Sequence, residues 1–81
     1  MSEVSRLQWQ CRRSMLELEL LLRGFLDGCY EQESETVQAA FNELLALSDQ
    51  TLQDLLFNEI ISEEAGIADV VERIKNQPLF P

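Results

Sequence analysis

The chain has 81 residues, enough for one domain spanning residues 1–81 but too few to spare volume for a deep catalytic cavity. Its 46% hydrophobic and 26% charged residues argue against global disorder, and the absence of histidine excludes histidine zinc sites and histidine general bases. The net charge of −9 argues against nucleic acid as a partner, because an acidic surface repels phosphate backbones.

The charge is distributed unevenly along the chain. Residues 1–23 hold four basic and three acidic residues, a net charge of +1, whereas residues 24–81 hold two basic and twelve acidic residues, a net charge of −10. No apolar run approaches the roughly 20 residues that span a bilayer, and residues 1–6 resemble neither a secretory signal nor a transit peptide. We therefore expect a cytoplasmic protein with no direct membrane insertion, in which Cys11 and Cys29 are reduced and buried.

Helical periodicity runs along nearly the whole chain, and no stretch alternates with the period of two that is typical of strands. Val4 to about Arg12 predicts a short first helix. From about Met15 to Cys29, apolar residues recur at spacings of three and four and predict a central, buried second helix. Leu16, Leu20 and Leu21 widen its buried stripe.

Three further helices follow. Ser34 is a good N-cap for the third, after a polar connection over residues 30–33, and Ser48-Asp49 marks the start of the fourth. A loop over residues 62–66 precedes the fifth, which Asn76 and Pro78 end before a loose tail at 77–81. The stripes expected to be buried are Val37, Phe41, Leu44 and Leu45, then Leu52, Leu55, Leu56 and Ile60, then Ile67, Val70, Val71 and Ile74. The sequence thus predicts an all-α, single-domain bundle of about five short helices.

No motif for binding a nucleotide or metal, or for a catalytic nucleophile, is present. The three glycines, Gly24, Gly28 and Gly66, are isolated and form no phosphate-binding loop. Glu17 and Glu19 lie two residues apart, on different sides of a helix, and so form no catalytic pair. We therefore expect a protein that is not an enzyme.

The segment from Gln8 to Glu19 is exceptional in composition. It holds the only tryptophan, Trp9, and the only adjacent arginine pair, Arg12-Arg13, which is the composition of an interface hot spot. A purely structural interpretation is also open. Ser14, followed three residues later by Glu17, forms a Ser-x-x-Glu capping box, and Arg13 could pair with an acid of its own chain.

The same segment resembles a family signature. Cys11-Arg12-Arg13-Ser14-Met15-Leu16-Glu17-Leu18-Glu19, preceded by Arg6 and Trp9, is similar to the Arg-Arg-Gly-Met-x-Glu-Leu-Asp segment of the SdhE family, also called succinate dehydrogenase assembly factor 2. Phe41-x-x-Leu44-Leu45 and Asp49-x-x-Leu52 fit the later part of the pattern, so the resemblance covers roughly residues 6–75. Members are small helical proteins that bind the flavoprotein subunit of succinate dehydrogenase or fumarate reductase and promote covalent attachment of FAD to a histidine of that subunit.

The resemblance implies a chaperone-like FAD assembly factor that binds no cofactor stably, because FAD belongs to the partner. It implies a partner-binding site in which Arg13 and Glu17 are exposed where the first two helices meet. That site is extended by Arg6, Trp9, Arg12, Ser14 and Glu19. Ser14 stands where the family has glycine, a residue that indicates either a positive φ or a close approach of another chain.

The free protein is expected to be a monomer. An alternative function remains open, that of an acidic protein-binding adaptor or the antitoxin of a toxin–antitoxin pair, binding through residues 24–81.

Overall fold

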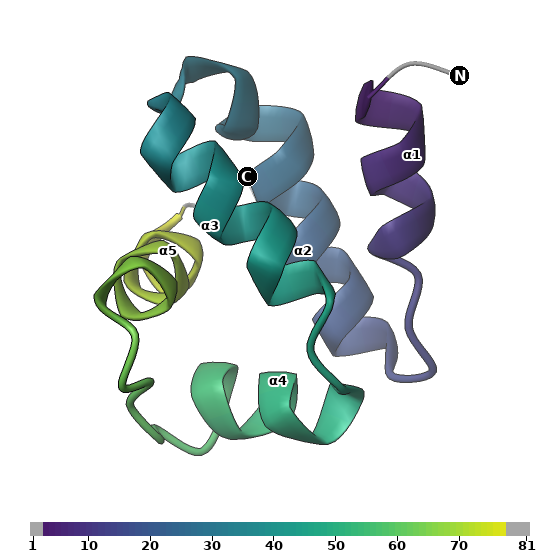
Figure 1. Ribbon diagram of the computed structural model, residues 1–81. Coiled ribbons are helices and arrows are strands. Elements are labelled where there is room, and N and C mark those ends of the chain that lie inside the picture. Colours follow the sequence, from purple (N-terminus) through teal and green to yellow (C-terminus); the bar gives the residue numbers. More distant parts are fainter. Residues whose placement is uncertain (1–2, 78–81) are drawn as a thin grey trace.

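A computed structural model describes residues 3–77, which form five α-helices and one 3-10 turn, with no strand in that range (Figure 1). The expected all-α bundle of five short helices is therefore confirmed. The elements are α1 (Glu3–Gln10), α2 (Leu16–Gly28), η1 (Tyr30–Gln32), α3 (Glu35–Leu45), α4 (Asp49–Leu56) and α5 (Ala65–Asn76).

Two of the predicted helix starts are set by serine caps. The Ser34 hydroxyl accepts a hydrogen bond from the Val37 backbone N–H at 3.3 Å, and the Ser48 hydroxyl accepts one from Thr51 at 3.2 Å. Each hydroxyl satisfies a backbone donor that the first turn of a helix leaves without an intrahelical partner. The cap at Ser34 was predicted correctly, and the cap predicted at Ser48-Asp49 is formed by Ser48; each interaction spans only three residues.

The core lies where α2, α3 and α5 meet, closed by α4 below and α1 at the side in the view of Figure 1. Phe41 of α3 is fully buried at its centre, with ring centroids 5.1 Å from Phe25 and 5.5 Å from Tyr30. Every apolar stripe residue predicted for the third and fifth helices is buried, as are Leu52, Leu55 and Leu56 of the fourth. Burial of these stripes is what stabilises such short helices.

Several details differ from the sequence expectations. Helix α4 ends at Leu56, so Ile60 lies outside it and is 56% exposed. The polar connection over residues 30–33 contains the buried Tyr30, whose hydroxyl accepts a hydrogen bond from the Asn42 side chain at 3.1 Å. Gly66 belongs to the first turn of α5 rather than to the preceding loop, and a Cβ there would lie 3.7 Å from the Ala40 Cβ of α3.

The cysteines and the end of the described chain also refine the expectations. Both thiols are free, but only Cys11 is buried, and burial raises its pKa to about 11; Cys29 is half-buried. Gln77 is not loose, because its side chain donates a hydrogen bond to the Leu21 carbonyl at 3.0 Å. The rest of the predicted tail lies outside the described residues. Within residues 3–77, no helix is long and apolar enough to cross a bilayer.

Candidate partner-docking site

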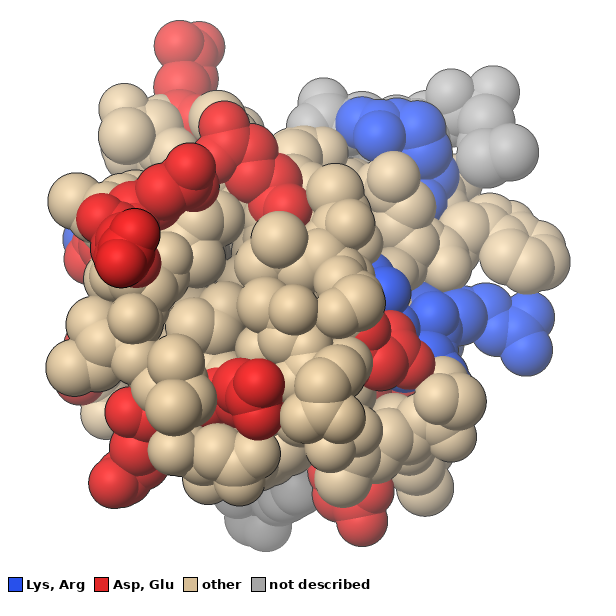
Figure 2. All heavy atoms as spheres, turned by 60° about the horizontal axis from the view of Figure 1, so that its bottom comes forward, with Lys and Arg blue, Asp and Glu red and all other residues tan. Residues whose placement is uncertain are grey.

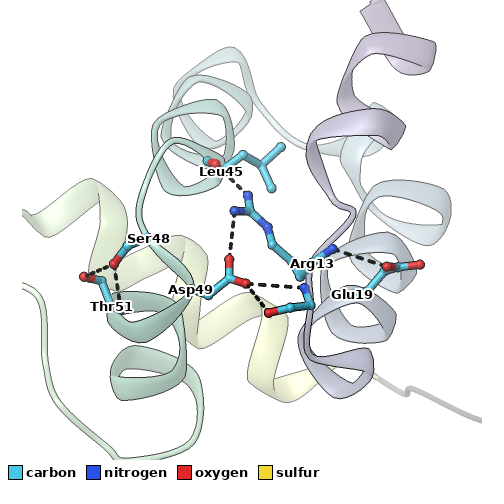
Figure 3. Close-up of polar contacts among 7 residues, drawn as sticks. Arg13, Glu19, Leu45, Ser48, Asp49 and Thr51 are labelled. Atoms are coloured by element: carbon cyan, nitrogen blue, oxygen red, sulfur yellow. Dashed lines mark hydrogen bonds and ion pairs between the residues drawn. The ribbon is translucent and has the colours of Figure 1, made fainter.

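Arg13 lies in the turn between α1 and α2 and reaches across to the corner between α3 and α4 (Figure 3). Its Nη1 donates to Oδ1 of Asp49 at 3.2 Å, and its Nη2 donates to the Leu45 carbonyl at 2.6 Å. The guanidinium therefore supplies a partner to one of the carbonyls that the last turn of α3 leaves without an intrahelical donor. The Arg13 side chain is only 12% exposed, so the expectation that it lies on an exposed face is wrong.

Ser14 joins the same acid. Its hydroxyl donates to Oδ2 of Asp49 at 3.1 Å, and its backbone N–H lies 3.4 Å from the same oxygen. The expected capping box with Glu17 is therefore absent: α2 begins at Leu16, and its N-cap residue, Met15, provides no side-chain hydrogen bond. Instead of capping α2, the Ser14 hydroxyl bonds to Asp49, which is 35 residues away in sequence and adjacent in space.

The backbone at Ser14 does not require glycine for its conformation. Among residues 3–77 only Glu59 is a non-glycine residue with positive φ. A positive φ is therefore not the reason for glycine at this position, which leaves the close approach of another chain. In this chain the extra hydroxyl is used within the molecule, on Asp49. We call Arg13, Ser14, Leu45 and Asp49 the clasp, since together they tie the turn before α2 to the corner between α3 and α4.

Asp49 accepts all the carboxylate bonds of the clasp. It lies in the first turn of α4, directly after the Ser48 cap, where a negative charge is also favoured by the helix dipole. Desolvation disfavours the charged form, but the hydrogen bonds from Ser14 and Arg13 outweigh it, and the pKa of Asp49 lies below its usual value of 3.8. The clasp therefore favours the ionised carboxylate.

This lowered pKa predicts a pH dependence of stability. Because the folded pKa is depressed, the contribution of Asp49 is present above the unfolded pKa of 3.8 and is lost as pH falls through the lower folded value. We expect the stability advantage of the wild type over Asp49→Asn to be constant near neutral pH and to shrink below about pH 4. Urea denaturation from pH 6 to pH 2.5 measures it, and an advantage that stays constant over that range would contradict the expected titration.

Glu19 holds the turn from its other side. Its Oε1 accepts a hydrogen bond from the Arg13 backbone N–H at 3.3 Å. Glu19 therefore binds the Arg13 backbone while Asp49 binds the Arg13 side chain, and the two acids lie on opposite sides of the residue (Figure 3). The half-buried Glu19 thus serves the turn and is not freely available to a partner. Arg6 likewise bonds within the molecule, to Gln10 at 3.3 Å and to Asn42 of α3 at 3.5 Å.

A different set of side chains is exposed beside the clasp. Trp9 is 64% exposed, with the Arg12 guanidinium carbon 5.3 Å from its ring centroid, a cation–π contact. Both line an open hollow of about 240 Å³ together with Arg23 of α2. Figure 2 shows most basic side chains gathered on one side of the molecule, with acidic side chains over much of the rest.

Helix α2 extends this exposed surface. Leu16 and Leu20, one turn apart, are 63% and 43% exposed, which corrects the expectation that they widen the buried stripe. Glu17 is exposed, and no hydrogen bond or ion pair within residues 3–77 occupies its carboxylate. We call Trp9, Arg12, Leu16, Glu17, Leu20 and Arg23 the docking face.

Sequence reasoning missed Leu16, Leu20 and Arg23 as parts of this surface. The signal was available, because the three residues follow one another at spacings of four and three and so share one side of α2. That side lies opposite the fully buried Leu18, Leu22 and Phe25. Leu16 and Leu20 were assigned to the buried stripe because they are apolar, without regard to the side of the helix on which their spacing places them.

Comparison with known proteins agrees with the motif. Residues 5–78 match the family described as flavinator of succinate dehydrogenase, Sdh5. The chain is 38% identical over 72 residues to the FAD assembly factor SdhE of Vibrio vulnificus, covering 89% of this chain and 84% of the relative. It is also 38% identical over 74 residues to the SdhE of Legionella pneumophila, covering 91% and 92%. The SdhE of Aliivibrio fischeri is 36% identical over 72 residues, covering 89% and 84%. A match over this share of both chains shows that the protein belongs to the succinate dehydrogenase flavinator family.

Proposed function

We propose that this chain is a cytoplasmic FAD assembly factor. It binds the flavoprotein subunit of succinate dehydrogenase or fumarate reductase and promotes covalent attachment of FAD to that subunit. The family match and the names of the relatives support the assembly role. The family description names succinate dehydrogenase. Fumarate reductase is included as a partner because of the resemblance of the motif.

The observation that carries the proposal is the clasp. It fixes the turn between α1 and α2 by four hydrogen bonds to Asp49 and Leu45, which come from outside that turn. The turn joins the two helices that bear the docking face, so the clasp sets the position of Trp9 and Arg12 relative to Glu17. A surface whose geometry is fixed before binding loses less conformational entropy when the partner docks.

The docking face has the composition expected of a protein interface. It combines an aromatic anchor and two arginines with exposed leucines and one exposed acid, Glu17, whose carboxylate has no hydrogen bond or ion pair within residues 3–77. Arg13, Ser14 and Glu19 act as positioning residues behind it. The predicted site is thereby divided in two, since part of it maintains the turn and part meets the flavoprotein.

The role proposed for this chain is to hold the partner, and not to carry out a bond-forming step. FAD and the acceptor histidine both belong to the flavoprotein, and this chain binds no cofactor stably. Docking would keep the two reacting groups aligned, which raises their effective concentration. Within residues 3–77, no group of three or more metal-ligating side chains is present.

Co-expression with a flavoprotein subunit tests the proposal. Covalent flavin on the subunit, read by in-gel fluorescence after denaturation, should rise when this chain is present and stay at background when it is absent. Separate co-expression with the succinate dehydrogenase and the fumarate reductase subunit distinguishes the two partners. Equal fluorescence with and without this chain, for both subunits, would overturn the proposal.

A further inference from the structure

A second group of exposed apolar side chains lies in the loop between α4 and α5. Phe57, Ile60 and Ile61 are 42%, 56% and 82% exposed. Single exposed apolar residues are common in soluble proteins, but three within five residues of one loop form a patch. This loop is at the lower left in Figure 1, across the molecule from α1, so the patch is separate from the docking face.

The loop is held in a defined shape. Glu59 has a φ of 58°, in the left-handed region that L-residues rarely adopt. The backbone N–H groups of Phe57 and Asn58 both donate to the Gln53 carbonyl, and that of Ile60 donates to Asp54 at 3.0 Å. The Asn58 side chain adds a bond to the Asp54 carboxylate at 3.0 Å. The two isoleucines are therefore displayed by an ordered loop.

Ile60 and Ile61 line two neighbouring hollows, and we call this pair the Ile60–Ile61 ridge. One, of about 560 Å³, extends toward Leu47 and Thr51, and the other, of about 340 Å³, extends toward Val71 and Lys75. Leu55 contributes to the lining of both. A ridge flanked by two hollows can receive apolar side chains that project from one side of a helix, one turn apart.

The borders of the hollows are acidic. Glu43 and Glu64 line the larger one, Glu59 and Glu72 line the smaller one, and among residues 3–77 Lys75 is the only cation lining either. This charge opposes an anionic lipid surface or a nucleic acid and favours a basic polypeptide. On a second copy of the chain, the basic surface formed by described residues is the docking face with Arg12 and Arg23, and a head-to-tail contact through it does not close into a dimer.

From these observations we propose that the α4–α5 loop is a second docking surface, whose occupant is a basic amphipathic helical segment of a partner polypeptide. Apolar side chains of that segment straddle the Ile60–Ile61 ridge, and its cations meet the acidic borders. The surface is independent of the proposed flavoprotein contact. Occupation of one surface leaves the other free.

The test uses a fluorescein-labelled helical peptide with leucines one turn apart on one face and lysines on the other, and a matched peptide in which glutamates replace the lysines. Fluorescence anisotropy should show saturable binding of the lysine peptide, weakened by raising the salt from about 50 to 300 mM. The glutamate peptide should not bind. Amide shifts in the nitrogen-15 spectrum of the full chain should cluster at the residues that line the two hollows, in α4, the α4–α5 loop and α5.

The matched variants are the double substitution Ile60→Ser, Ile61→Ser in the loop and Leu16→Ser, Leu20→Ser on the docking face. The loop variant should weaken lysine-peptide binding by about tenfold or more, and the α2 variant should leave it unchanged.

The proposal is overturned by failure of the lysine peptide to bind, by equal binding of both peptides, or by loss of binding only in the α2 variant. Concentration-dependent dimers in sedimentation that the loop variant abolishes would also overturn it, because the occupant would then be a second copy. Covalent flavin in the co-expression assay should not change in the loop variant, so failure here leaves the flavoprotein proposal standing.

Discussion

Arg13→Ala should destabilise the protein by about 2 kcal/mol, because a hydrogen bond to a charged group contributes about 1.5–3 kcal/mol and its removal takes the Arg13 donor away from the carbonyl of the buried Leu45. The substitution removes the donors to Asp49 and to the Leu45 carbonyl while the side chain that it deletes is only 12% exposed. For a domain of this size, a loss of that magnitude lowers Tm by about 8–16 °C. Urea and thermal denaturation followed by circular dichroism measure both quantities.

Arg12→Ala is the matched control, since Arg12 is the adjacent arginine and its guanidinium stacks on the exposed Trp9 ring, with no hydrogen bond or ion pair within residues 3–77. Its cost should be about 0.5 kcal/mol, within the range of exposed cation–π contacts. A double-mutant cycle with Asp49→Ala should show non-additive losses of stability, because Arg13 and Asp49 are in direct contact. Equal stability of the Arg13 and Arg12 variants would show that the clasp does not stabilise the fold.

Glu17→Ala should have the opposite signature, with loss of flavoprotein binding and little change in stability. The carboxylate is exposed and has no partner within residues 3–77, so its removal should change the free energy of unfolding by less than about 0.5 kcal/mol. If it meets a cation of the flavoprotein, binding should weaken about tenfold or more, equivalent to about 1.4 kcal/mol. Calorimetric titration with the subunit and in-gel flavin fluorescence measure the effect.

Glu31→Ala provides the control, because Glu31 is another exposed acid and lies in η1, outside the docking face. It should leave both binding and covalent flavin unchanged. The comparison separates a specific contact of Glu17 from a general effect of one negative charge on a chain of net charge −9. Normal flavinylation with Glu17→Ala would remove Glu17 from the interface and leave the family motif with a purely structural role.

Arg13→Ala and Glu17→Ala therefore distinguish two functions within one motif. Loss of Arg13 should reduce flavinylation in proportion to the fraction of molecules in which the turn between α1 and α2 is no longer folded. Loss of Glu17 should reduce flavinylation although the protein remains fully folded. Lowering the temperature should partly rescue the Arg13 variant. It should not rescue the Glu17 variant, since the contact itself is missing.

Local chemistry made much of the fold predictable. The caps at Ser34 and Ser48 act over three residues, and the stripe from Ile67 to Ile74 repeats at the helical period, so each can be found within a short window. The capping box at Ser14 was equally plausible by the same rule and is wrong. Its hydroxyl had a competing acceptor, Asp49, which no local window contains.

The sequence by itself determined the helical class, the approximate positions of the helices and the segment proposed to carry the function, because periodicity, capping and composition are local properties. Tertiary structure alone decided which residues of the motif and of the α4–α5 loop are buried. It buried Arg13 against Leu45 and Asp49, and it exposed Leu16, Leu20 and Ile60. Burial and hydrogen-bond partners depend on which distant helix lies alongside. For that reason the motif could be located from the sequence, but its division into a clasp and a docking face could not.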